Sequence, residues 1–223
     1  MSSGFVHLHT HSSYSPMWGI PTLEALCQAA RTQGQDRLAL TDTNGLYGAI
    51  RFLEVAKHEG LKPILGAELV HKAHRAVLLA KTPAGYANLC RLLSARHEES
   101  TFDFIAAVAR YRAGLIILSD DLSALRTWRK DSPKDVYVEL TPGSDIQEAI
   151  TFSRRNGLSP VATTRAACLH PTDFEAHRLL RPGGQLSFLS SSPLAAVCSP
   201  LDGGSPVGDR LIRDYFGLHA IDW

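Results

Sequence analysis

Residues 38–70 read LALTDTNGLYGAIRFLEVAKHEGLKPILGAELV and hold a strand, a helix and a second strand in succession. The apolar runs 38–41 and 63–70 have the length of strands. Residues 50–59 between them have helical spacing and end at Gly60, which is a common helix terminator. Strands that alternate with helices are typical of a parallel sheet or barrel, so this stretch predicts an α/β fold.

The same alternation continues on both sides of this stretch. Further strands are expected at residues 5–9, 76–80, 115–118, 136–140 and 160–162. Further helices are expected from residue 23 to Gly34, from Thr82-Pro83 onward, and at residues 104–110, 122–130, 146–155 and 171–180. Roughly seven strands in about 180 residues favour a closed or nearly closed α/β barrel over an open doubly wound sheet. In both folds ligands bind at the carboxyl ends of the strands.

The composition is that of an ordinary globular chain. Of 223 residues, 44% are hydrophobic and 20% are charged, and the formal net charge of +1 does not mark the whole surface for nucleic acid. No apolar run of membrane-spanning length and no signal peptide is found, so we expect a cytoplasmic protein without a membrane partner. The four widely spaced cysteines predict neither a thiolate zinc cluster nor a disulfide framework.

The C-terminal part differs from the rest of the chain. Between residues 182 and 208, 15 of 27 residues are Gly, Pro or Ser, and no periodic pattern is present. We therefore expect a folded domain over residues 1–181 and a tail over residues 182–223 that is flexible or a truncated continuation.

The strongest local signal is the run His7-Leu8-His9-Thr10-His11. Alternate residues of a strand share one face, so the three imidazoles can point the same way at a strand's carboxyl end. Two neutral imidazoles at this spacing can hold one divalent metal ion. The alternative interpretation is a polar loop whose histidines only form hydrogen bonds.

Two carboxylates follow short apolar strands and are expected at the same rim. Asp42 follows the strand at 38–41, and Glu68 lies at the end of the strand at 63–70. Carboxylates in this position can ligate or bridge metals. The alternatives are a helix cap for Asp42 and an exposed polar residue for Glu68.

These segments resemble the PHP (polymerase and histidinol phosphatase) family. The resemblance is carried by FVHLHTHSSYS (5–15), LALTDTN (38–44) and KPILGAE (62–68) in this order. Four further segments resemble the branch found in bacterial DNA polymerase III alpha: LLAKTPAGYANLCRLLS (78–94), VYVEL (136–140), PVATT (160–164) and HPTDFEAHRLL (170–180). The resemblance covers residues 4–181. It implies a distorted seven-stranded α/β barrel with up to three metal ions, often zinc or manganese, at the carboxyl end.

The resemblance also implies which residues bind metal and which ligands are lost. His9, His11 and Glu68 match family ligands, whereas His7 takes a place outside the ligand set. The other family ligand positions fall on residues that do not ligate in this way: Trp18, Thr43, Arg75, Pro142, Arg165 and Ala167. His74 lies one residue from the position of Arg75 and is expected on the opposite face of its strand. Asp42 is retained and is the candidate catalytic residue.

Three ligands can hold at most one zinc or manganese ion, and weak or absent metal binding is expected. Arg165 would bring a positive charge beside Glu68, which opposes a metal cation. We therefore expect a structural PHP module of a DNA polymerase III alpha-like protein in DNA replication or repair. Its expected partners are a polymerase core or other replication proteins, with DNA as a further candidate. The resemblance ends before polymerase carboxylates would occur, so DNA-directed DNA polymerase activity is not expected in this chain.

Two alternatives remain from the sequence. The first is a residual metal-dependent phosphoesterase or 3′–5′ exonuclease that uses His9, His11, Asp42 and Glu68. The second is a nucleic-acid-binding module with a basic surface. That surface would be formed by Arg75, Arg91, Arg96, Arg110, Arg112, Arg126, Arg129 and Lys130.

Overall fold

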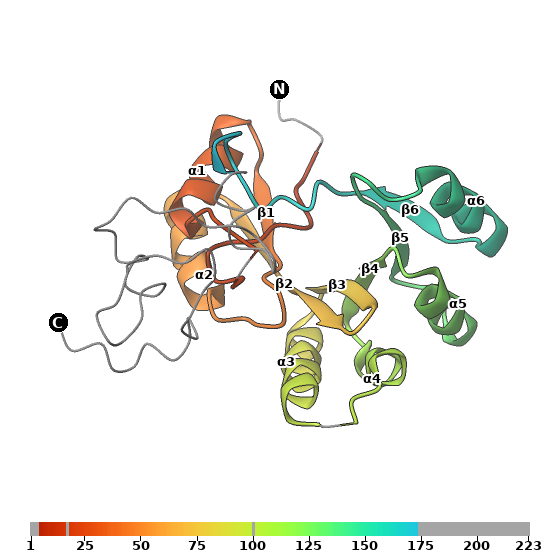
Figure 1. Ribbon diagram of the computed structural model, residues 1–223. Helices are drawn as coiled ribbons and strands as arrows, with labels where there is room; N and C mark the ends of the chain where they lie inside the picture. The colour runs from red at the N-terminus through yellow and green to blue at the C-terminus, as the bar shows by residue number, and fades with distance from the viewer. Residues whose placement is uncertain (1–4, 17, 100, 174–223) are drawn as a thin grey trace, which may run out of the picture.

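A computed structural model describes residues 5–16, 18–99 and 101–173 of the chain (Figure 1). The described elements alternate as the sequence predicts. In order, they are α1 (Leu23–Thr32), β1 (Arg37–Leu40), α2 (Ala49–His58), β2 (Lys62–His71), β3 (His74–Ala80), α3 (Pro83–Glu98), α4 (Phe104–Tyr111), β4 (Leu115–Ser119), α5 (Leu122–Asp131), β5 (Val136–Leu140), α6 (Ile146–Asn156) and β6 (Ser159–Ala162).

Side-chain caps explain where several helices begin. Thr82 accepts a hydrogen bond from the backbone N–H of Gly85 at 3.0 Å, and Pro83 follows it at the first helical position of α3. Both features satisfy or remove N–H groups that a helix start leaves without a partner. Asp103, Asp121 and Asp145 cap α4, α5 and α6 in the same way. The expected start of α3 at Thr82-Pro83 is therefore confirmed.

The six strands form one sheet in the order β1-β2-β3-β4-β5-β6. β1 pairs with β2 in parallel, and β4, β5 and β6 are also parallel, but β3 is antiparallel to both of its neighbours. The expectation of an all-parallel sheet is wrong at β3. Only Lys72 and Ala73 separate β2 from β3, and a connection this short can join only antiparallel strands.

The sheet curls into a half-barrel, with the helices on its outer side (Figure 1). Alternate strand residues point outward and pack against the helices. The larger outer cluster joins α3–α6 to β2–β5 around Trp128 and Phe104, and a smaller one joins α1 and α2 to β1 around Phe52. The remaining strand residues point inward, where Ala39, Val77, Leu79 and Leu118 form an apolar layer.

The N-terminal segment, residues 7–11, runs beside β1 without forming the strand expected at residues 5–9. Its carbonyls at His7 and Thr10 accept hydrogen bonds from the N–H groups of Ala39 in β1 and of Thr41, which follows β1. The two accepting residues lie three positions apart in the chain, whereas the two donating residues lie two positions apart. Regular strand pairing is therefore interrupted. On the other side, Ala166 exchanges backbone bonds with His9 and His11 at 3.0 and 2.8 Å. The segment thus lies between β1 and the chain that follows β6.

The expected helix at residues 171–180 lies almost wholly outside the described residues, as does the expected tail at 182–223. Before that point the chain leaves β6 and crosses to the side of the molecule that carries α1 (Figure 1). There Leu169 packs against the cluster of α1, β1 and α2. Among the helices of the described part of the chain, none is both long and apolar enough to cross a membrane.

Candidate metal centre

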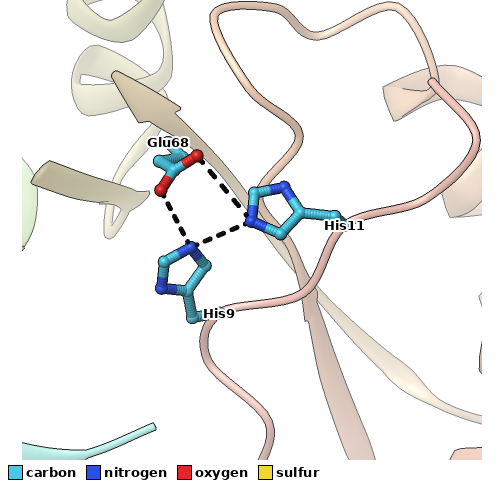
Figure 2. Close-up of side chains that lie close together, drawn as sticks. All are labelled: His9, His11 and Glu68. Carbon is cyan, nitrogen blue, oxygen red and sulfur yellow. Dashed lines mark hydrogen bonds and ion pairs between the residues drawn. The ribbon is translucent and has the colours of Figure 1, made fainter. Parts of the chain in front are cut away.

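His9, His11 and Glu68 converge at the carboxyl end of the strands, as expected, and are buried (Figure 2). The Nε2 atoms of the two imidazoles are 3.1 Å apart. Glu68 Oε1 is 3.4 Å from His9 Nε2, and Glu68 Oε2 is 3.7 Å from His11 Nε2. All three side chains therefore direct a potential ligand atom at one point.

The fold explains this convergence. Glu68 lies near the end of β2 and faces inward, because it pairs with the inward residue Val77 of β3. His9 and His11 lie two residues apart on the N-terminal segment, which is held on both sides by backbone hydrogen bonds. The site thus combines one regular strand with an irregular segment next to β1.

Glu139 is a site residue that sequence reasoning missed. It lies on β5, and its Oε1 accepts a hydrogen bond from His9 Nδ1 at 2.6 Å and another from Thr163 Oγ1 at 2.6 Å. A proton on His9 Nδ1 leaves Nε2 with a lone pair that faces His11. Glu139 Oε2 is buried without a hydrogen-bond partner. The available signal was a glutamate that alternates with the outward residues Val136 and Val138, which predicts an inward carboxylate.

Two arginines flank the other side of Glu68. Arg165 Nη2 is 3.3 Å from Glu68 Oε1, and Arg75 Nη1 is 3.8 Å from the same oxygen. The expected positive charge of Arg165 beside Glu68 is therefore confirmed, and Arg75 adds a second one. Thr43, which the resemblance to the family places at a histidine position, donates a hydrogen bond to Glu68 Oε2 at 2.9 Å.

Burial and charge shift the pKa values of this cluster in different directions. Burial alone would raise the pKa of Glu68, but the hydrogen bond from His9 and the charges of His11, His9 and Arg165 lower it to about 2. Burial lowers the pKa of His11 to about 3, with His9, Arg165 and Arg75 acting in the same direction. Burial also opposes a charge on His9, but Glu139 and Glu68 outweigh it and raise the pKa of His9. Glu68 is thus ionised, and His11 is neutral, at neutral pH.

Asp42 is buried next to this centre and holds the loop after His11. Its carboxylate accepts hydrogen bonds from the Ser12 N–H at 2.7 Å, from Ser12 Oγ at 2.8 Å and from Ser15 Oγ at 2.6 Å. Burial raises the pKa of Asp42, although these hydrogen bonds act against the rise. It is not the cap of α2, because Gly48 occupies that position. These contacts of Asp42 position the loop, and its catalytic role stays a prediction.

His7 and His74 lie outside the cluster. His7 Nδ1 is 2.8 Å from Thr164 Oγ1, so the expectation that His7 shares a face with His9 and His11 is not met. His74 lies on the outer face of β3, as expected, where it binds Asp121 at 2.6 Å and stacks on Phe104. The resemblance to the family places a carboxylate at the position of Trp18. The guanidinium carbon of Arg165 lies over the Trp18 ring, 4.9 Å from the centre of that ring.

Most of the basic residues considered for a nucleic-acid surface make intramolecular contacts instead. Arg112 donates to the carbonyls of Trp128, Ser132 and Lys134, and Arg129 donates to the carbonyl of Asn156. Other intramolecular contacts, to a carboxylate, an amide, a carbonyl or an aromatic ring, are made by Arg75, Arg91, Arg96, Arg110 and Arg126. These contacts favour structural roles over a continuous basic groove.

The fold and the cluster together define an α/β half-barrel domain in which two imidazoles and one carboxylate could hold a metal ion. The chain belongs to the PHP family, because the profile of the PHP domain matches residues 7–141. DNA polymerase III subunit alpha of Pasteurella multocida (strain Pm70) is 30% identical over 209 residues, which cover 78% of this chain and 18% of the polymerase subunit. An error-prone DNA polymerase of Symbiobacterium thermophilum is 47% identical over 94 residues, or 42% of this chain and 9% of that polymerase. The chain thus spans less than a fifth of the length of these relatives.

Solved structures support the fold. A two-domain protein from Bacteroides vulgatus, which contains a predicted PHP-like metal-dependent phosphoesterase, has a TM-score of 0.51 at 14% identity. The comparison covers 73% of this chain and 51% of that one. A proposed metal-dependent phosphoesterase from Bifidobacterium adolescentis has a TM-score of 0.52 at 12% identity, covering 75% of this chain and 90% of the other. At these identities the likeness concerns the fold alone.

Proposed function

We propose that this chain is a structural PHP module of the DNA polymerase III alpha type that works in DNA replication or repair. The observation that carries this proposal is the environment of Glu68. Two imidazoles occupy one side of this carboxylate and two guanidiniums occupy the other. A buried carboxylate surrounded in this way is stabilised by the protein's own cations, and the centre retains ligands for at most one metal ion.

The three donor atoms fit one small divalent ion. Tetrahedral zinc with bonds of about 2.0–2.1 Å requires ligand atoms roughly 3.3 Å apart. The observed separations of 3.1, 3.4 and 3.7 Å are close to this value. Two nitrogens and one carboxylate oxygen suit zinc, with manganese as the alternative. When bound, the ion would supply a Lewis acid that polarises water or a phosphate oxygen.

The surrounding residues would prepare this donor set. Glu139 fixes the ring of His9 through Nδ1, which is the usual role of a carboxylate behind a metal-binding histidine. Thr43 orients Glu68 through Oε2. Arg165 acts against metal binding, because its positive charge competes with the ion for Glu68. We therefore propose occupancy by one ion at most, with an affinity below that of a site without the arginine.

A residual phosphoesterase or 3′–5′ exonuclease is the second candidate. It is favoured by the retained His9–His11–Glu68 group, because three protein ligands leave a coordination position for water. The small number of ligands argues against it. Among the described residues, His9, His11 and Glu68 are the one group of three or more side chains that could hold a metal ion. A single ion lacks the second metal with which two-metal hydrolases clamp both the attacking and leaving oxygens.

The finer architecture and the setting of the module are also proposals. The N-terminal segment, hydrogen-bonded to β1 on one side and to Ala166 on the other, supports a barrel in which it takes the seventh place. The proposed domain covers residues 1–181, and residues 182–223 form the proposed tail. The polymerase relatives support a polymerase core or other replication proteins as partners, DNA as a further one, and a cytoplasmic location.

Elemental analysis of the purified chain tests this proposal. After dialysis against zinc or manganese, we expect no more than one ion per chain and no cleavage of a 3′-labelled oligonucleotide. His9→Ala should lose the ion, whereas His58→Ala should keep it, because His58 is an exposed side chain on α2. Two or more ions per chain, or oligonucleotide cleavage that disappears in His9→Ala, would overturn the structural role and support the phosphoesterase.

A further inference from the structure

Four exposed apolar side chains gather on α2 and at its start. Tyr47 is 70% exposed, Ile50 67%, Tyr14 40% and Leu53 36%. The described part of the chain exposes six large apolar side chains in all, so most of them lie here. An apolar patch of this kind on a protein surface commonly marks a place where another segment or molecule packs. We call Tyr14, Tyr47, Ile50 and Leu53 the α2 patch.

The geometry of α2 makes the α2 patch continuous. Ile50 and Leu53 lie three residues apart on this helix, so their side chains are neighbours on its surface. The ring of Tyr14 lies over Gly48, the residue that begins the helix, because a Cβ added there would be 2.9 Å from that ring. Tyr47 directly precedes Gly48. The two tyrosines therefore extend the apolar surface beyond the first turn of α2.

The described part of the chain ends on the side of the molecule that carries α1 and α2 (Figure 1). Leu169 packs against the cluster of α1, β1 and α2, and the description ends four residues later at Asp173. Residues 174–208 separate this point from residue 209. A Gly- and Ser-rich chain of that length has an average span of about 30–35 Å. A helix of ten residues such as α2 is about 15 Å long, so residue 209 and those after it can reach the α2 patch.

Residues 209–223 have a sequence that suits an apolar surface. The stretch DRLIRDYF (209–216) places Leu211, Ile212, Tyr215 and Phe216 at the spacing of one helix face, and arginine and aspartate fill the other positions. A helix of about two turns is marginal in water by itself, so such a sequence needs a surface that covers its apolar face. The α2 patch offers two aliphatic and two aromatic side chains for this purpose.

We propose that the α2 patch is the docking surface for residues 209–223 of the same chain. The apolar face of this segment packs across Ile50 and Leu53 and against the two tyrosine rings. Tethering favours this occupant over a second copy of the chain, because a flexible linker gives an effective concentration on the order of millimolar. Docking requires no metal ion and goes beyond the structural role proposed above, so either proposal can fail without the other.

Hydrogen–deuterium exchange of the full chain, measured by mass spectrometry in EDTA, tests this proposal. The quantity measured is the exchange rate of the backbone N–H groups of residues 209–216, compared with a free peptide of the same sequence. Ile50→Asp places a charge in the α2 patch, and Phe216→Asp places one in the segment. The matched control is Ile146→Asp, which alters an isoleucine that is 46% exposed on α6. Light scattering over the same range of protein concentrations gives the oligomeric state.

We expect residues 209–216 to exchange roughly tenfold or more slowly than the free peptide, in a monomer and at every concentration. Ile50→Asp and Phe216→Asp should each restore the rate of the free peptide, and Ile146→Asp should leave the slow rate unchanged.

Three results overturn the proposal. The first is exchange as fast as that of the free peptide in the unaltered chain. The second is slow exchange that survives Ile50→Asp. The third is slow exchange only at concentrations where light scattering detects a dimer, which would assign the α2 patch to a second copy. If circular dichroism shows that Ile50→Asp does not fold, Tyr47→Asp takes its place, because Tyr47 is the most exposed residue of the patch.

Discussion

The two sides of Glu68 differ in chemistry although they share one carboxylate. On the histidine side, the Nε2 atoms of His9 and His11 face the carboxylate of Glu68, and Glu139 orients His9. On the arginine side, Arg165 and Arg75 bring fixed positive charges to Oε1. A buried carboxylate needs compensating charge, and the fold supplies it whether or not a metal ion is bound. The comparison shows that the buried charge of Glu68 is compensated by the chain's own residues without a metal ion.

The largest effect is expected on stability, when the carboxylate that the two sides share is replaced. Glu68→Gln should destabilise the fold by about 3–5 kcal/mol, because it leaves buried cationic groups without their counter-charge. Urea unfolding in EDTA measures the change. Glu54→Gln on the exposed side of α2 is the control and should change stability by less than about 0.5 kcal/mol. A loss of under about 1 kcal/mol for Glu68→Gln would show that the two sides do not depend on this charge.

The histidine side can be tested alone through zinc affinity. His9→Ala should abolish stoichiometric binding, because it removes a ligand. Glu139→Gln keeps an acceptor for His9 but loses the charge, and it should weaken binding roughly 10- to 100-fold. Competition with a chromophoric chelator gives both values. Glu148→Gln on α6 serves as the control, and an unchanged affinity in Glu139→Gln would remove this residue from the site.

The arginine side should act in the opposite direction. Arg165→Ala removes a positive charge 3.3 Å from Glu68 and should raise zinc affinity about tenfold. The same chelator competition measures the gain, with Arg154→Ala as the matched control. If affinity falls or stays the same, Arg165 does not compete with the ion, and the contrast between the two sides is electrostatically unimportant.

The most gradual effect is expected from pH. His11 has its pKa lowered from 6.5 to about 3, so between pH 6 and 4 it takes up a proton only on unfolding. Stability is therefore lost as pH falls through this range, by at most about 1.4 kcal/mol per pH unit for one proton. His9, whose pKa is raised, is protonated in both states there and adds little. Urea unfolding in EDTA at several pH values should show a slope that decreases in His11→Asn, and an equal slope would contradict this assignment.

The contrast also shows what sequence could predict. Alternating periodicity predicted most strands and helices near their observed bounds, and position after a strand predicted that Glu68 joins the histidines. Both follow from local patterns, because side chains alternate along a strand and parallel strands end at one rim.

Other features were not predicted. The reversed direction of β3 follows from the two-residue turn after β2, because the apolar patterns of the two strands do not show the length of the turn between them. The N-terminal segment is irregular because it has one more residue between its two hydrogen-bonded positions than the chain at β1 has between the corresponding donors. Glu139 lies 130 residues from His9, and no local pattern links the two. The close packing around Gly19 was not predicted either. A Cβ added at Gly19 would lie 1.9 Å from the carbonyl oxygen of Ser12.

The position of the N-terminal segment has a consequence for synthesis on the ribosome. His9 emerges among the first residues, but Glu139 and Ala166, which hold it, emerge more than 120 residues later. At about 5–20 residues per second, the early histidines therefore wait several seconds before their partners exist. The candidate centre is therefore among the last parts of the described fold that can assemble, because its formation requires β5 and the chain that follows β6.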